Sequence, residues 1–110
     1  CAVGEAIDRS IRLGEAKVRG GLSMMLLTSA GEYPVPTAVA QRLPQVPRTP
    51  QPDQPDYESR RRAFADWLDA SPENSIDYER LRRWHLIQDE RASRAMASGQ
   101  VFVVTADGLE

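Results

Sequence analysis

The apolar positions of residues 2–19 recur at steps of three and four, which places them along one face of a helix. They are Val3, Ile7, Ile11, Gly14 and Val18. Acidic and basic residues four positions apart, such as Glu5 and Arg9, support the helix in the favourable orientation. We therefore predict an amphipathic helix over residues 2–19, ended by Gly20 and Gly21.

Two short apolar runs have the length of strands. Residues 22–28 read Leu-Ser-Met-Met-Leu-Leu-Thr, which suits a buried strand, with a resumed helix as the alternative. Residues 101–104 read Val-Phe-Val-Val, and their β-branched side chains favour a strand. We expect the two runs to be strands of one small sheet.

The middle of the chain is rich in proline. Seven of the eight prolines lie between residues 34 and 55, and three of them repeat every third residue. This period matches a polyproline II helix, which is extended and has no internal hydrogen bonds. We predict an extended segment with neither regular helix nor central strand over residues 44–56, preceded by one short helical turn within residues 37–43.

Two further helices are predicted to form a hairpin. The first spans residues 56–70, with Asp56 as its N-cap. The second begins at Ser71, which caps it, followed by proline at the first helical position, and it ends at Gly99. The residues expected to face inward are Tyr57, Phe64, Trp67, Leu68, Tyr78, Leu81, Trp84 and either Ile87 or Gln88.

These elements predict an α+β fold that is mainly helical, with three helices, a proline-rich extended segment and one or two short strands. At 110 residues, the chain is large enough for one domain at most. We divide it into an N-terminal helix and short apolar strand (residues 1–32), a proline-rich linker (residues 33–56) and a helical hairpin with a C-terminal strand (residues 57–110).

The charge balance argues against nucleic acid as a partner. The formal net charge is −2, and acidic residues match the arginines of the predicted hairpin. The arginine clusters at residues 60–62 and 80–83 therefore indicate a solvated, salt-bridged surface. We also predict no transmembrane span, because no apolar run approaches the roughly 20 residues that one requires.

The residues that usually carry catalysis are scarce. Cys1 and His85 are the only cysteine and histidine, and they are far apart in the sequence. No serine or cysteine has a recognisable nucleophile context, and no metal-ligand spacing is present. We expect His85 to be structural or at the surface, and we predict no enzyme activity and no cofactor.

The first residue leaves two localisations open. Cys1 followed by Ala2 matches the start of a mature lipoprotein, and a chain cut at this point from a longer protein matches equally well. We favour the cytoplasm and keep a lipidated Cys1 as the alternative.

Residues 64–85 resemble the N-terminal cytoplasmic domain of FecR-type anti-sigma regulators. The matching residues are Phe64, Trp67, Leu68, Ala70, Ser71, Pro72, Tyr78, Glu79, Leu81 and Trp84. The closing tryptophan comes one residue earlier than in the family. The resemblance implies a helical module that binds a sigma factor, with Trp67, Leu68, Tyr78 and Trp84 in or behind the contact face.

These observations predict a non-catalytic protein-binding module, with anti-sigma-like regulation in a bacterium as its specific form. The alternative is a structural or assembly protein of a mobile element or secretion apparatus, with an extended proline-rich arm lying over a neighbouring subunit. A homo-oligomer is compatible with both. Any apolar surface of the hairpin that the chain itself leaves uncovered would mark a partner site.

Overall fold

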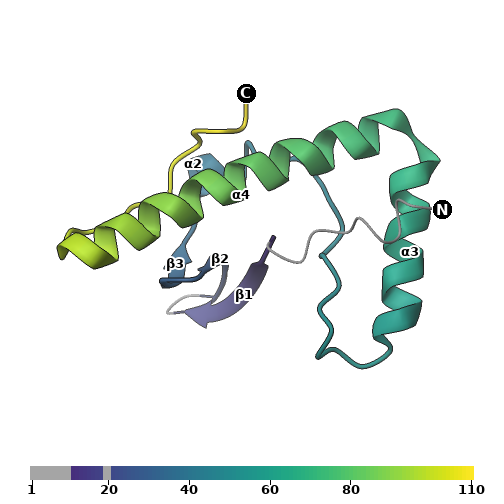
Figure 1. Ribbon diagram of the computed structural model, residues 1–110, viewed down its shortest axis with the longest axis horizontal. Helices are drawn as coiled ribbons and strands as arrows, with labels where there is room; N and C mark the ends of the chain where they lie inside the picture. Colours follow the sequence, from purple (N-terminus) through teal and green to yellow (C-terminus); the bar gives the residue numbers. More distant parts are fainter. Residues whose placement is uncertain (1–10, 19–20) are drawn as a thin grey trace.

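The computed structural model describes residues 11–18 and 21–110 of the chain (Figure 1). This part contains a three-stranded antiparallel sheet and three helices, which confirms the predicted α+β, mainly helical fold. The elements are β1 (Leu13–Val18), β2 (Gly21–Thr28), β3 (Gly31–Pro34), α2 (Thr37–Ala40), α3 (Tyr57–Ala70) and α4 (Pro72–Ser98).

The sheet is a meander in the order β1-β2-β3. Leu13 lies opposite Leu26, and Val18 lies opposite Gly21. The strand predicted for residues 22–28 is therefore confirmed as β2. The helix predicted over residues 2–19 is wrong for residues 13–18, which form β1, while residues 1–10 and 19 lie outside the described residues.

The reason for this difference is energetic. Charge pairs four residues apart stabilise a helix by only about 0.2–0.5 kcal/mol each. The observed arrangement instead pairs alternate backbone groups of β1 with β2 and buries Ile11 and Leu26. Burial of a large apolar side chain contributes about 1.5–3 kcal/mol, so tertiary packing outweighs the local helical pattern.

The turn between β2 and β3 is attached to α4. The Ser29 backbone N–H donates to Asp89 Oδ1 at 2.7 Å, and the Ser29 and Ser93 hydroxyls lie 3.0 Å apart. Within the turn, the Thr28 hydroxyl donates to the Gly31 carbonyl at 2.7 Å. These bonds hold the sheet against the middle of α4.

The predicted helical hairpin is confirmed as α3 and α4. The Ser71 hydroxyl accepts from the Glu73 backbone N–H at 3.2 Å, and Gly99 ends α4 with φ 70°. Asp56 stands at the N-cap position of α3, but it is left-handed with φ 56° and its side chain makes no cap bond. Asp56 is therefore the N-cap residue of α3 as predicted, and its carbonyl accepts from the Arg60 N–H at 3.0 Å, but the expected side-chain cap is wrong.

Two side chains near the start of α4 stabilise the end of α3. The Asn74 amide donates to the Trp67 carbonyl at 2.7 Å, and the Ser75 hydroxyl donates to the Leu68 carbonyl at 3.1 Å. Carbonyls in the last turn of a helix have no intrahelical partner, so these bonds satisfy them. The corner between α3 and α4 is thus well defined.

Residues 101–104 are not a strand, which corrects the prediction of a C-terminal strand and of a sheet shared with residues 22–28. The C-terminal segment instead runs back along α4 (Figure 1). Side chains of α4 bind its backbone: the Thr105 N–H donates to Gln88 Oε1 at 3.0 Å, and the Trp84 indole donates to the Thr105 carbonyl at 2.7 Å. The side chains of Val104 and Leu109 are buried.

Residues 44–56 of the proline-rich segment contain no helix or strand, as predicted, and the predicted helical turn before them is α2. Residues 52–56 form turns, with the Gln54 N–H donating to the Gln51 carbonyl at 3.0 Å, so the prediction of an extended segment is wrong for this part. Figure 1 shows this segment passing between β1 and α3. Thr49 and Pro50 are nevertheless buried, and Val46 is half-buried. The segment therefore packs against the rest of the chain.

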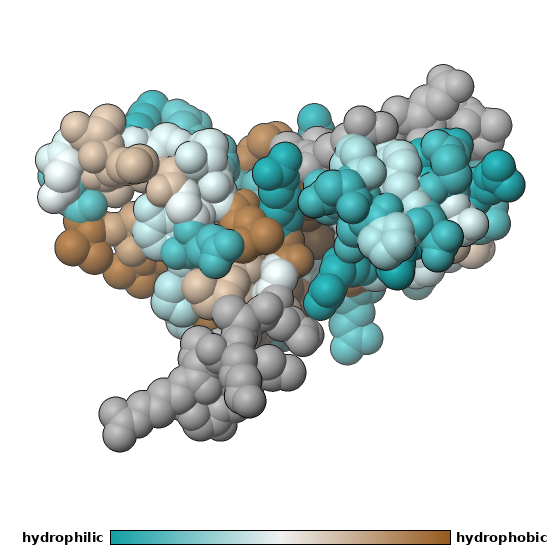
Figure 2. Space-filling view, turned by 90° about the horizontal axis from the view of Figure 1, so that it is seen from below, coloured by the Kyte–Doolittle hydropathy of each residue, from teal (hydrophilic) through white to brown (hydrophobic). Residues whose placement is uncertain are grey.

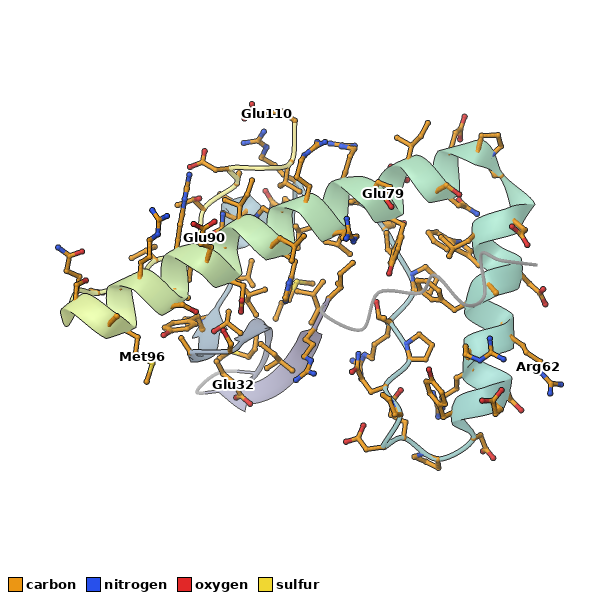
Figure 3. The ribbon with its side chains drawn as sticks, in the orientation of Figure 1. Glu32, Arg62, Glu79, Glu90, Met96 and Glu110 are labelled. Atoms are coloured by element: carbon orange, nitrogen blue, oxygen red, sulfur yellow. The ribbon has the colours of Figure 1, made fainter. Side chains whose placement is uncertain are left out.

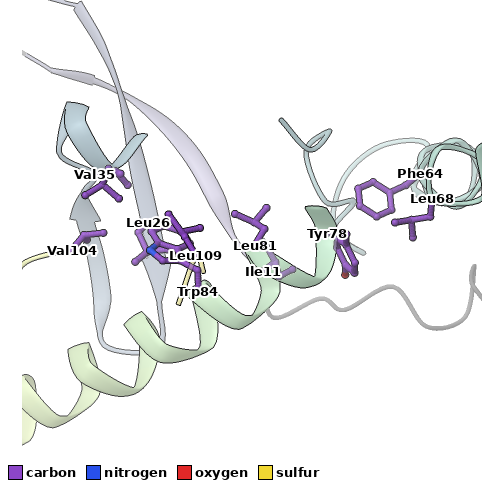
Figure 4. Packing of buried hydrophobic residues seen from close by; sticks show 11 residues of the cluster. Ile11, Leu26, Val35, Phe64, Leu68, Tyr78, Leu81, Trp84, Val104 and Leu109 are labelled. Carbon is purple, nitrogen blue, oxygen red and sulfur yellow. The ribbon is translucent and has the colours of Figure 1, made fainter. Parts of the chain in front are cut away.

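A continuous core joins the sheet, the helices and the C-terminal segment. Figure 4 shows its two parts, with Trp84 beside Leu26 and Leu109, and Tyr78 beside Phe64 and Leu68. Other segments thus cover much of the apolar side of α3 and α4. Among the described helices, none combines the length and apolar character needed to cross a bilayer.

Candidate protein-binding cleft

A cleft of about 580 Å³ lies beside the first residues of β1. One wall contains the consecutive residues Arg12, Leu13 and Gly14, together with Leu27 of β2. Leu27 belongs to the inner strand and its side chain lies near Gly14, so the hollow also reaches over the face of the sheet that these two residues share. The opposite wall is formed by residues between Arg48 and Gln54, and we call this hollow the edge cleft.

The hydrogen-bond pattern shows which backbone groups of β1 face the edge cleft. The Leu27 N–H donates to the Arg12 carbonyl at 3.0 Å, so Arg12 and every second residue after it bond to β2. The backbone N–H and C=O groups of Leu13, Glu15 and Lys17 consequently point away from β2. Among the described strands, none pairs with this edge.

An apolar hollow continues from the edge cleft toward the core. A second space of about 200 Å³ is lined by Ile11, Leu13, Met24, Val46 and Leu81, among others. A neighbouring hollow shares Leu13 and Met24 and reaches Trp67. Figure 2 shows hydrophobic surface in the depression between the two ends of the molecule. The region therefore offers apolar contacts next to a strand edge.

Charged residues line the edge cleft, and hydrogen bonds within the chain hold one of its walls in place. Arg12 and Arg48 line it together with Asp53. In the far wall, the backbone N–H of Gln51 donates to Gln54 Oε1 at 2.8 Å, and the Gln51 side chain donates to the Thr49 carbonyl at 3.3 Å. These bonds hold the wall in place, so the cleft is shaped before any ligand arrives.

The four residues predicted to bind a partner fall into two groups. Trp84, Tyr78 and Leu68 are buried in the chain's own core, with exposed fractions of 0, 4 and 6%. Trp67 is half-buried and lines the hollow that adjoins the edge cleft. The structure brings Trp67 and Tyr78 together around the Phe64 ring, whereas Trp84 lies in the part of the core shared with the sheet.

His85 lies in the interface between α4 and the sheet. It is buried, and its Nε2 atom is 3.1 Å from the Leu27 carbonyl. This position gives His85 a role in packing α4 on β2. In the part of the chain that the structure describes, no three His, Cys, Asp or Glu residues are grouped as metal ligands.

Several arginines pair with acids on their own helix, as expected for a salt-bridged surface. Arg94 lies 2.7 Å from Glu90, four residues away, whereas Glu58 pairs with Arg61, three residues away, at 3.0 Å. The side chains of Arg62, Glu79 and Glu90 extend away from the core (Figure 3).

Two arginines of the second cluster have a role that the sequence did not suggest. Arg80 donates to the Leu109 carbonyl at 2.8 Å, and Arg83 donates to the Gly108 carbonyl at 3.1 Å. Both arginines therefore hold the C-terminal segment on α4.

Sequence reasoning missed the residues that form the edge cleft. One available signal was Gly14, because a glycine inside a helical pattern costs about 1 kcal/mol relative to alanine and weakens that assignment. Another was Gly20-Gly21 between two apolar stretches, which is typical of a hairpin. No local signal links residues 12–14 to residues 48–54, since their proximity arises only from the fold.

Comparison of the chain with protein-family models, with curated proteins and with solved structures finds no match.

Proposed function

We propose that this protein is a non-catalytic protein-binding module that holds a segment of its partner in the edge cleft. The observation that carries the proposal is the combination, in one place, of a strand edge with which none of the described strands pairs, an apolar hollow and two arginines. Peptide-binding sites commonly combine main-chain hydrogen bonds with pockets for alternate side chains.

We further propose anti-sigma-like regulation, with a bacterial sigma factor as the partner to test first. Its support is the resemblance of residues 64–85 to FecR-type regulators. The matching residues Phe64, Leu68 and Tyr78 pack α3 against α4, and this packing positions Trp67 beside the hollow. The resemblance thus concerns the scaffold on which one side of the binding region is built.

The test is a binding measurement between the purified protein and sigma factors of its host, by isothermal titration calorimetry. Gly14→Phe should fill the edge cleft and weaken binding at least about tenfold, the equivalent of roughly 1.4 kcal/mol. Gly14→Ala is the matched control, because a Cβ there would lie 3.6 Å from Leu27 Cδ1, an ordinary contact.

Both variants should keep the wild-type melting temperature within a few degrees. Equal affinity of the two Gly14 variants would contradict the placement of the site. Failure of every sigma factor to bind would contradict the proposed partner.

A second candidate function, assembly into a larger structure, is favoured by a different surface. Met96, Val101 and Val103 are 66, 90 and 63% exposed near the end of α4, and Figure 3 shows Met96 pointing away from the molecule. Exposed apolar groups of this kind commonly mark contacts between proteins. Sedimentation analysis should then show self-association that Val101→Glu abolishes and Gly14→Phe leaves unchanged.

A further inference from the structure

We propose that residues 102–110 exchange between two copies of the chain, so that the C-terminal segment of each copy binds α4 of the other. This inference rests on the second proposed function, assembly, and specifies the partner as a second copy of the chain. It does not depend on the edge cleft.

Side chains of α4 form a site for the backbone of an extended segment. Gln88 Oε1 accepts from the Thr105 N–H at 3.0 Å, and Gln88 Nε2 donates to the Asp107 carbonyl at 3.1 Å. The Trp84 indole donates to the Thr105 carbonyl at 2.7 Å. Gln88 and Trp84 are fully buried, so removal of the segment would leave their polar groups without these partners, which is unfavourable. The site therefore requires an occupant.

The remaining contacts show which segment fits the site. Arg91 lies 2.6 Å from the Asp107 carboxylate, and Arg80 donates to the Leu109 carbonyl at 2.8 Å. The Leu109 side chain is buried beside Trp84 (Figure 4). The site thus accepts an extended backbone with an aspartate two residues before an apolar side chain. A second copy carries this same segment and can make the same contacts.

A single turn at Gly99 connects α4 to the segment. Gly99 has φ 70°, and the Gln100 N–H donates to the Ala95 carbonyl at 2.9 Å. The left-handed conformation costs little for glycine and is unfavourable for other residues. Within the described part of the chain, the backbone of residues 101–103 makes no hydrogen bond. A change of conformation at Gly99 would therefore direct the segment away from its own helix without breaking a backbone bond in residues 101–103.

Apolar side chains around this turn favour exchange over the closed form. Met96, Val101 and Val103 are 66, 90 and 63% exposed, and residues 95–106 contain no charged side chain. In an exchanged dimer the two links cross at a twofold axis, where these side chains cover those of the other copy and no like charges meet. Contacts within the site are the same in both forms, so the added burial at the crossing favours the dimer.

The first test reverses the charges of one ion pair, whose side chains are 47 and 60% exposed, so that the variants should fold. Arg91→Glu and Asp107→Arg each place like charges together within one variant. Exchange between the two variants joins the helix of one to the segment of the other and restores opposite charges at both contacts. With a heavy-isotope label on one variant, native mass spectrometry of an equimolar mixture should show the mixed dimer at least about fivefold more abundant than either homodimer.

The double variant that combines Arg91→Glu with Asp107→Arg is the matched control. Its charges are complementary in both the closed and the exchanged form, so it should self-associate like the wild type. A mixed dimer at its statistical abundance, about twice that of each homodimer, would overturn exchange, because association without exchange leaves the helix and segment of each copy together.

The second test acts on the turn. Gly99→Ala strains the closed form through its positive φ, and no described atom beyond its neighbours lies within 4 Å of the added Cβ. The exchanged form releases this strain, so the dimer dissociation constant from sedimentation equilibrium should fall at least about tenfold. Ser98→Ala is the matched control, because it changes the adjacent helical residue and leaves the turn unstrained. An unchanged or higher dissociation constant of Gly99→Ala would contradict the proposal.

Failure of exchange and failure of assembly give different results. If a charge variant does not fold, as judged by circular dichroism, the Gly99→Ala comparison decides the question alone. Wild-type protein that stays monomeric up to about 1 mM would refute both exchange and assembly. Self-association that Val101→Glu abolishes, together with a statistical mixture of the two charge variants, would refute exchange and leave assembly standing.

Discussion

Replacing Trp84 by alanine should destabilise the protein far more than replacing Trp67. The Trp84 side chain is fully buried between α4, the sheet and the C-terminal segment, beside Leu26 and Leu109. Its indole also donates to the Thr105 carbonyl at 2.7 Å. The Trp67 side chain is only half-buried, and its ring centroid lies 5.7 Å from that of Phe64.

The expected difference follows from this burial. Truncation of a buried tryptophan to alanine costs about 3–5 kcal/mol, which includes the cavity that it leaves. Loss of the bond to Thr105 adds about 1 kcal/mol. Trp67→Ala should cost less, about 1–2 kcal/mol, because part of its side chain already contacts water. A domain of this size has a total stability of about 5–15 kcal/mol, so Trp84→Ala would remove a large share of it.

The assay is urea denaturation followed by far-ultraviolet circular dichroism, which reports the helices of both variants. Trp84→Phe separates the two contributions, since it keeps most of the buried volume and removes the indole donor. Trp67→Ala should in addition weaken partner binding. A cost of Trp84→Ala below about 2 kcal/mol, or one no greater than that of Trp67→Ala, would refute this account of the core.

Three further predictions concern local contacts. Ser71→Ala should lower the free energy of unfolding by about 1 kcal/mol in thermal denaturation, and Ser71→Asp should not, because either serine or aspartate can cap α4. Gly108→Ala should speed amide exchange in the C-terminal segment measured by mass spectrometry, because its Cβ would lie 2.9 Å from Trp84 Cα and its φ is 104°; unchanged exchange would contradict this. The hydrogen bond and charge of Arg91 lower the pKa of Asp107 below 3.8, so the associated stability is complete above pH 3.8 and is lost as the pH falls through the lower folded pKa. A nuclear magnetic resonance titration should show the Asp107 pKa rising in Arg91→Gln, and no rise would contradict the assigned cause.

The sequence by itself determined the elements whose causes are local. Ser71, Pro72 and Gly99 mark the ends of α4, and its apolar period identifies Tyr78, Leu81 and Trp84 as buried. The period left the next inward position open between Ile87 and Gln88, and the structure buries Gln88. The prolines similarly exclude helix and central strand from residues 44–56. In each case the controlling interactions lie within a few residues, so the sequence pattern contains them.

The tertiary structure decided the elements for which two local conformations were close in free energy. Residues 13–18 have a helical charge pattern, but pairing with β2 makes them a strand. Residues 101–104 have β-branched side chains, yet the segment follows α4 because Gln88 and Trp84 bind the backbone of Thr105. Local conformational preferences amount to a few tenths of a kcal/mol per residue, so the larger free energy of such tertiary contacts determines the conformation.

The candidate site depended entirely on the tertiary structure. Periodicity placed Trp67 and Trp84 on the apolar sides of their helices, but only the packing of the sheet and C-terminal segment covers Trp84 and leaves Trp67 partly exposed. The edge cleft joins residues 12–14 to residues 48–54, which are distant in the chain. Its open backbone groups also depend on which side of β1 is paired, a property of the sheet that residue types alone do not encode.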